Sequence, residues 1–452
     1  MDQGPNSKPR RRKMHPVKIF LRKHKNLIIG VSVLVFTALI IVIAAVSSGQ
    51  RAERARQESL AAQESLDAQN AVDRQEADRI IAEAEAVAAT YDFDGAIAVL
   101  DSFGTKLYEF DDMLELRDKY EYTKNNLVAY TGSDTVHLSV QVLIADADRA
   151  FASKEHGAGF KRNFITTDEF RNLLQQLHSN GYVLIDMDDV VEVLTDEDGN
   201  TYYSEKSVML PESKKPLMLT QTQVNYYTYM VDPDGDGIAD ENGAGFANRL
   251  ILENGKLTNA MVDKNGNTVT GAYDLVPILE EFLLEHPDFS YGGARPLLAL
   301  TGYDGIFGYR GDALSEVTPV LEALREKDYK FGYYTYYNTS FAKSSAAKIT
   351  DEGERWSKHI VPVLGETPYM VYALSGDIES ANKRYSGEKF EALQAQGLRY
   401  YLGFCDNGEP WFLVESGYVR MGRILANANN LRSNPEWFAG ICDPTAVLVE
   451  NR

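Results

Sequence analysis

Polar and aromatic side chains gather at the ends of two predicted strands, at residues 216–220 and 329–334. The first strand is followed by Gln221, Thr222, Gln223, Tyr226 and Tyr227, and the second ends in a run with Tyr334, Tyr336, Tyr337 and Asn338. A tyrosine ring stacks on the apolar face of a pyranose while its hydroxyl hydrogen-bonds the sugar. We therefore predict a ligand site at Gln221, Tyr226, Tyr227, Tyr336 and Tyr337, with strand packing as the alternative role of the rings.

An aspartate-rich loop offers ligands for a hard cation. Asp232, Asp234 and Asp236 alternate along the chain, and Asp240 follows. Carboxylates at the first, third and fifth positions with a glycine at the sixth match the first half of a calcium-binding loop. The twelfth position is Gly243 rather than a bidentate glutamate. We therefore predict a weak calcium site, with a solvated acidic turn as the alternative.

The histidines and cysteines lack the spacing of a transition-metal site. Beyond the N-terminal tail the histidines are His137, His156, His178, His286 and His359, and no two stand three or four residues apart. Cys405 and Cys442 lack zinc-type spacing, and their separation does not decide whether they form a disulfide. We expect no transition metal. Asp146, Asp148 and Asp304 lie near strand ends, which leaves a relocated carboxylate site open.

The elements that position these residues begin at about residue 133. Apolar strands at 136–145, 182–185, 216–220, 297–301, 329–334, 369–374, 398–404 and 411–414 alternate with helices at 167–180, 274–285, 317–326 and 387–396. This alternation predicts a parallel sheet covered by helices, with a β/α barrel as the first choice and its site where the strands end. Residues 231–271 break the pattern, and two Asn-Gly turns predict an inserted β-meander there.

The N-terminal region has the composition of a membrane anchor. Residues 1–26 carry nine basic side chains and one acid, and residues 27–47 are uncharged and almost entirely apolar. That segment is long enough to cross a bilayer, and the positive-inside rule predicts a cytoplasmic N-terminus and an extracellular remainder. The predicted protein is thus a single-pass protein of the cell membrane. A cleaved signal peptide is the competing interpretation.

Residues 48–132 are predicted to form a helical stalk and a helical hairpin. The first forty are rich in Ala, Glu, Gln and Arg without Gly or Pro after Arg51, and an apolar stripe includes Ile80, Ala84 and Val87. After a turn at 91–94 a second helix begins, for which Asp94 is the expected cap. No second copy follows at the period of a helical repeat, so we interpret this region as a spacer.

The charge balance excludes one class of partner. The chain has 452 residues and a net charge of -20, and only its short N-terminal tail is strongly basic. A nucleic-acid partner requires a basic face, so none is expected.

Several segments together resemble the polysaccharide deacetylase (NodB-homology, carbohydrate esterase) family. They include FITTDEFRNLLQQLHSNGYVLIDMDDV, KPLMLTQTQVNYYTYM and YKFGYYTYYN, and the resemblance spans roughly residues 136–445. It implies a distorted β/α barrel in which an Asp acts as base while a second Asp and two His hold a divalent metal. The matching positions here are Thr222, Gln223, Tyr334 and Asn338. All four are neutral, so the resemblance implies a divergent member without the metal and base residues.

Three hypotheses follow for the function. The first is a membrane-anchored, extracellular, catalytically inactive protein that binds cell-envelope polysaccharide or acts as a scaffold. The second is an active deacetylase of N- or O-acetylated polysaccharide with relocated metal ligands. The third is an interaction protein whose helical stalk recruits a protein partner that the sequence leaves unknown.

Overall fold

The computed structural model describes residues 16–232 and 245–449, which fall into two compact units. The first unit ends at Arg79 and contains α1 (Pro16–Lys23) and most of α2 (Lys25–Ala89). Within the described residues, α2 is the one helix long and apolar enough to cross a membrane. The predicted anchor and the start of the predicted stalk are therefore one continuous helix.

The second unit begins at Ile80 and opens with a helical hairpin. Ile80 and Ala84 at the end of α2 are buried, as the apolar stripe predicts. The chain turns at Tyr91 and continues into α3 (Phe93–Asp101) and α4 (Asp111–Asn125). The cap of α3 is Asp92, whose carboxylate accepts a hydrogen bond from Gly95 N, so the expectation of Asp94 as the cap is corrected by two residues.

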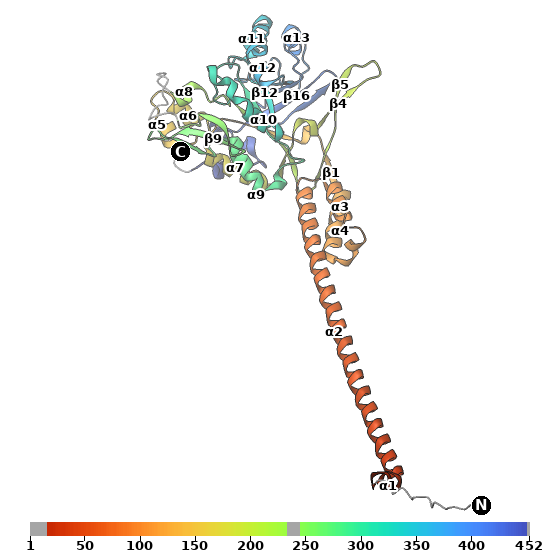
Figure 1. Ribbon diagram of the computed structural model, residues 1–452. Coiled ribbons are helices and arrows are strands. Elements are labelled where there is room, and N and C mark those ends of the chain that lie inside the picture. Colours follow the sequence, from red (N-terminus) through yellow and green to blue (C-terminus); the bar gives the residue numbers. More distant parts are fainter. Residues whose placement is uncertain (1–15, 233–244, 450–452) are drawn as a thin grey trace, which may run out of the picture. The chain divides into compact units, whose positions relative to one another are not determined.

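Seven parallel strands of the described chain close into a barrel (Figure 1). Each strand pairs with the next around the ring, and the last, β16, pairs back with the first, β2. In spatial order the strands are β2 (Val136–Gln141), β7 (Lys215–Thr222), β11 (Leu297–Leu300), β12 (Lys330–Tyr333), β13 (Tyr369–Val371), β14 (Tyr400–Phe404) and β16 (Tyr418–Leu425). The prediction of a distorted β/α barrel is confirmed.

The distortion lies at β7, which shares one edge between two strands. Its first half pairs with β3 (Tyr182–Leu184) through Tyr182↔Lys215, and its second half pairs with β11 through Leu297↔Thr220. All residues of β7 after Lys215 are buried, because a strand in the wall of a barrel is covered on both faces.

Helices on the outside cover the strands. In α7 (Thr167–Ser179) the buried residues Phe170, Leu173, Leu174 and Leu177 form one apolar stripe, and Thr166 and Glu169 make a capping box at its start. This helix packs beside α9 (Leu275–Glu285). The remaining covering helices are α10 (Thr318–Glu326), α11 (Ala346–His359), α12 (Val361–Leu364) and α13 (Glu388–Gln394).

The other elements are insertions and edges. The predicted meander is present as the antiparallel strands β8 (Arg249–Glu253), β9 (Lys256–Val262) and β10 (Thr268–Gly271). Further strands are β1 (Leu127–Tyr130), β4 (Val191–Thr195), β5 (Thr201–Glu205), β6 (Val208–Pro211) and β15 (Phe412–Glu415), and the last runs antiparallel to β16. The short helices are α5 (Ala147–Ala152), α6 (Gly157–Asn163), α8 (Thr228–Val231), α14 (Ala428–Ser433) and α15 (Pro444–Val447).

Candidate functional site

The four neutral motif positions lie at the carboxyl ends of two strands that flank β11. Thr222 is the last residue of β7 and Gln223 follows it, while Tyr334 and Asn338 follow β12. The side chains of Thr222 and Tyr334 are hydrogen-bonded to each other, and Gln223 Oε1 accepts a hydrogen bond of 3.3 Å from Gln141 Nε2. These positions supply hydroxyl and amide groups, which are poor ligands for zinc.

The buried side chain of Arg423 places a positive charge near the motif positions. Arg423 on β16 is fully buried, and the donors of its guanidinium bond Gly403 O, Tyr372 O and Ser139 Oγ. Burial lowers the pKa of Arg423 to about 10, so the side chain stays charged at neutral pH. Burial also raises the pKa of Tyr334, and the charge of Arg423 opposes part of that rise. A dication at the motif positions would therefore meet a positive charge.

The backbone around the motif positions is wound into the left-handed region. Gln223 has a φ of 65°, Thr335 a φ of 58° and Asn338 a φ of 54°. Such conformations cost about 1–3 kcal/mol for residues other than glycine and collect at functional sites. The loops after β7 and β12 are therefore held in strained turns.

Gln221 and Tyr226 lie in a buried network rather than on the surface, which corrects their predicted exposure to a ligand. Asp274, the residue before α9, accepts hydrogen bonds from Gln221 Nε2 at 2.6 Å, Tyr226 OH at 2.7 Å and Leu143 N at 3.0 Å. Asn259 Nδ2 donates to Tyr226 OH at 3.1 Å. Burial raises the pKa of Asp274 to about 6 although these donors favour its charged form. The network ties β7 to the meander and to α9.

Five tyrosines from three strand-end loops form what we call the tyrosine row: Tyr227, Tyr229, Tyr303, Tyr336 and Tyr337. Tyr227 stacks on Tyr229 at 5.7 Å between ring centroids and on Tyr303 at 5.3 Å. Tyr303 continues to Tyr337 at 6.2 Å, and Tyr337 contacts Tyr336 at 4.7 Å. The loops after β7, β11 and β12 thus contribute to one series of contacting rings.

Exposure differs along the tyrosine row. Tyr227 is buried, which favours the alternative role of packing for this ring, and its hydroxyl donates to Thr301 Oγ1 at 3.0 Å. Tyr303 and Tyr336 are half-buried, while Tyr229 and Tyr337 are 36% and 45% exposed. The surface available for stacking therefore belongs to Tyr229, Tyr303, Tyr336 and Tyr337. The sequence prediction of the ligand site did not include Tyr229 and Tyr303, although Tyr303 directly follows Thr301-Gly302 at the end of β11.

Three contacts hold Tyr336 and Tyr337, at one end of the tyrosine row, in place. The buried carboxylate of Glu352 in α11 accepts hydrogen bonds from Tyr336 N at 2.9 Å and from Tyr337 N at 3.2 Å. A Cβ atom at Gly302 would lie 2.0 Å from the ring of Tyr336, so only glycine fits there. Lys348 Nζ lies 5.1 Å from the centre of the Tyr337 ring. The rings are thus positioned before any ligand arrives.

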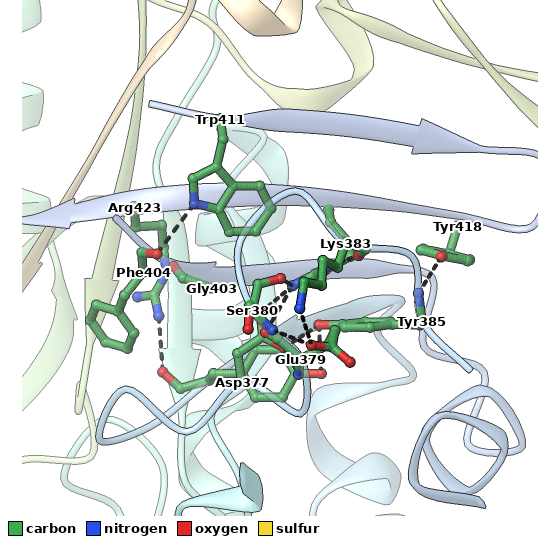
Figure 2. A network of polar contacts seen from close by, with 12 residues as sticks. Asp377, Glu379, Ser380, Lys383, Tyr385, Gly403, Phe404, Trp411, Tyr418 and Arg423 are labelled. Carbon is green, nitrogen blue, oxygen red and sulfur yellow. Dashed lines mark hydrogen bonds and ion pairs between the residues drawn. The ribbon is translucent and has the colours of Figure 1, made fainter. Parts of the chain in front are cut away.

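A polar cavity of about 300 Å³ opens at the carboxyl ends of β13 and β14. Its lining consists of Ser375, Asp377, Ile378, Glu379, Ser380, Ala381, Phe404, Asp406 and Trp411. Figure 2 shows the loop that carries Asp377, Glu379 and Ser380 beside Trp411. Arg420, fully buried, bonds Asp377 Oδ2 at 2.9 Å and lies against the rings of Tyr385 and Trp411. This cavity was not predicted from the sequence, because its lining residues come from separate loops.

The carboxylates considered for a relocated site have structural partners. Asp304 accepts hydrogen bonds from Thr228 N and from Arg310 Nε at 2.8 Å, and Asp146 caps α5 by accepting from Arg149 N. Neither these two nor Asp148 belongs to a metal-binding cluster among the described residues. Of the predicted calcium ligands, Asp232 is buried at the end of α8, and Asp234, Asp236 and Asp240 lie outside the described residues, so calcium binding stays a prediction. Cys405 and Cys442 are both buried and free.

Comparison with known proteins finds similarity only among solved structures. No protein-family model and no curated protein matches the chain. A Streptococcus pyogenes deacetylase, PplD, solved in complex with acetate, is similar at 12% identity and a TM-score of 0.33, over 70% of this chain and 99% of that one. A de-N-acetylase from Aggregatibacter actinomycetemcomitans is similar at 11% identity and a TM-score of 0.36, over 68% and 99%. The barrel assignment itself rests on the strand order described above.

The raised pKa of Asp274 predicts that the free energy of unfolding depends on pH. Its folded pKa of about 6 lies above the usual value of 3.8, so the folded state binds this proton more tightly. The unfolding free energy of the native chain should therefore fall by about 2–3 kcal/mol from this group as pH rises from about 4 to 6, and then level off. Denaturant unfolding of the full chain in detergent should show that Asp274→Asn removes this slope. The exposed control Asp312→Asn should keep it, and equal slopes in both variants would contradict the assignment.

Proposed function

We propose that this chain is a membrane-anchored glycan-binding protein of the cell envelope, built on a deacetylase-like barrel and catalytically inactive. The tyrosine row is the observation that carries the proposal. Stacked, partly exposed tyrosines at the carboxyl ends of barrel strands offer flat apolar faces with hydroxyl groups at their edges. Carbohydrate-binding clefts need both features.

The geometry of the row supports binding to an extended glycan rather than to a single small molecule. The series of ring contacts runs from the exposed Tyr229 through the buried Tyr227 and the half-buried Tyr303 to the exposed Tyr337, which contacts Tyr336 at the end of the row. Glu352 and the close approach at Gly302 fix the ring positions, so little side-chain entropy remains to be lost on binding. Several sugar rings in succession could then stack along the row.

The absence of catalysis is proposed from the chemistry of the motif positions. Hydrolysis of an acetyl group through a metal-bound water needs anionic or imidazole ligands and a base near the water. Thr222, Gln223 and Tyr334 provide neither, and the buried charge of Arg423 opposes a dication nearby. Binding without turnover is the function that remains for this face.

The anchor supports a place at the cell envelope. The apolar start of α2 is exposed over its whole length within its own unit, as suits a helix surrounded by lipid. The basic tail before it favours a cytoplasmic N-terminus, and the barrel would then lie outside the cell.

The first test of this function removes exposed rings from the tyrosine row. Tyr337→Ala and Tyr303→Ala should each weaken binding of the full chain to acetylated chito-oligosaccharides or isolated cell-wall polysaccharide by about tenfold, because each removes a stacking contact of about 1–2 kcal/mol. Isothermal titration measures the change, and melting temperatures should stay close to the native value. Tyr122, a more exposed tyrosine of α4 outside the row, supplies the control Tyr122→Ala. Equal binding by Tyr337→Ala and this control would refute the site.

A second test addresses catalysis. The full chain should release no acetate from acetylated chito-oligosaccharides, with or without added Zn²⁺ or Co²⁺, since its motif positions hold no charged ligand. Acetate can be quantified by a coupled assay beside an active deacetylase as positive control. Steady, chelator-sensitive release would instead support a working enzyme with relocated ligands.

A third test addresses topology. Protease added to intact cells should remove the chain beyond about residue 50 and spare an epitope placed at the N-terminus, because the nine basic residues hold the tail inside. Immunoblots against tags at both ends give the result. Protection of the C-terminal tag would reverse the orientation, and a soluble form that starts near Ser48 would identify a cleaved signal.

A further inference from the structure

His178 meets the neighbouring pair His286 and Asp288, more than a hundred residues later in the sequence, at the amino-terminal end of the barrel. His178 lies near the end of α7, His286 directly follows α9, and Asp288 lies in the short helix η4 (Pro287–Phe289). One ligand atom from each lies within 4.8 Å of the others, and His178 Nε2 is 3.0 Å from Asp288 Oδ1. The imidazole centroids of His178 and His286 are 4.4 Å apart.

The surroundings of these side chains are those of an ordered site. The ring of Phe282 lies 4.5 Å from His286 and 6.0 Å from His178, and Phe289 lies 6.2 Å from His178. All three candidate ligands are half-buried. A partly apolar shell of this kind fixes ring orientation and lowers the local dielectric constant around a bound ion.

Lys214, just before β7, brings a positive charge that would compete with a bound cation for Asp288. Its ammonium bonds Asp288 Oδ2 at 2.9 Å, whereas Oδ1 is the oxygen nearest to His178. An ion can therefore reach Oδ1 while the lysine stays on Oδ2. The lysine charge would weaken binding of a cation at this distance without blocking it.

We propose that His178, His286 and Asp288 bind one zinc ion. Two imidazoles and a carboxylate are ligands that Zn²⁺ accepts in tetrahedral sites, with a water in the fourth position. Nitrogen ligands favour such borderline metals over Mg²⁺ and Ca²⁺, which prefer all-oxygen sites. The ligand atoms must draw together by side-chain rotation, since metal–ligand bonds of about 2 Å bring them closer than 4.8 Å.

The position of the site assigns it a structural role. The ion would fasten η4 to α7 and α9, and η4 also holds the segment that follows α2. Tyr91 OH donates to Asp288 O at 2.7 Å, and Gly292 N donates to Thr90 O at 3.0 Å. Zinc would thus stabilise the join between the end of α2 and the barrel, on the end opposite the tyrosine row.

The test measures zinc binding by the metal-stripped full chain, purified in detergent without a histidine tag. Titration with Zn²⁺ in excess Ca²⁺ should show one tight site per chain, and Co²⁺ should give the visible spectrum of a tetrahedral complex. His286→Gln should weaken zinc binding by on the order of 100-fold or more, since loss of a ligand exceeds the loss from an outer-sphere partner. His359→Gln and Gln223→Ala should leave it unchanged.

A variant that binds zinc more tightly shows that a change in zinc affinity does not come from misfolding. Lys214→Met removes the competing charge and should bind zinc several-fold more tightly, an outcome that a damaged fold does not produce. No stoichiometric zinc in the native chain, equal affinity of His286→Gln and His359→Gln, or unchanged affinity of Lys214→Met would each overturn the proposal. Loss of binding in Gln223→Ala would place the metal at the motif positions instead and contradict the inactive site as well.

Discussion

The barrel depends on the hydrogen bonds that the buried guanidinium of Arg423 donates. Its strand, β16, closes the ring between β14 and β2, and its three bonds reach one group on β14, one after β13 and one on β2. A buried charge is costly to desolvate, so it persists only where enough acceptors surround it. These acceptors exist only when the strands are in register. Arg423 therefore favours one register for closure of the barrel, and its charge also adds positive electrostatic potential at the motif position Tyr334.

The two ends of the barrel therefore differ in character. At the carboxyl end, strained loops carry tyrosines, amides and a polar cavity, and two of the carboxylates there form the ion pairs Asp377–Arg420 and Asp304–Arg310. At the amino end, imidazole and carboxylate groups remain half-exposed around His178. Recognition by shape and stacking suits the first end, and cation binding suits the second. The amino end of such barrels more often serves stability, which agrees with a structural ion there.

Much of the fold was predictable, and the exceptions have physical causes. The alternation of apolar strands and helices located α7, α9, α10 and most barrel strands, and two Asn-Gly turns located the meander. The alternation missed β16, because Arg420 and Arg423 interrupt its apolar pattern and only the folded barrel supplies their partners. In the site, strand-end position identified Tyr336 and Tyr337, but it did not separate them from Tyr226 and Tyr227. Tyr226 is buried beside the meander and Tyr227 beside the loop after β11, whereas Tyr336 and Tyr337 stay partly exposed. The meeting of His178 with His286 depends on helix packing alone.

The left-handed turn at residue 223 bears on how this barrel could change over evolutionary time. Aspartate and asparagine tolerate a positive φ better than glutamine does, because their short side chains bond the local backbone. An aspartate at 223 would thus relax its own turn, and the asparagine at 338 already occupies a conformation suited to it. A lineage that gained acidic groups here would need no loop remodelling. Under the proposed inactive function, the difference from a metal-dependent enzyme at this position lies in the identity of a few side chains and in the nearby charge of Arg423.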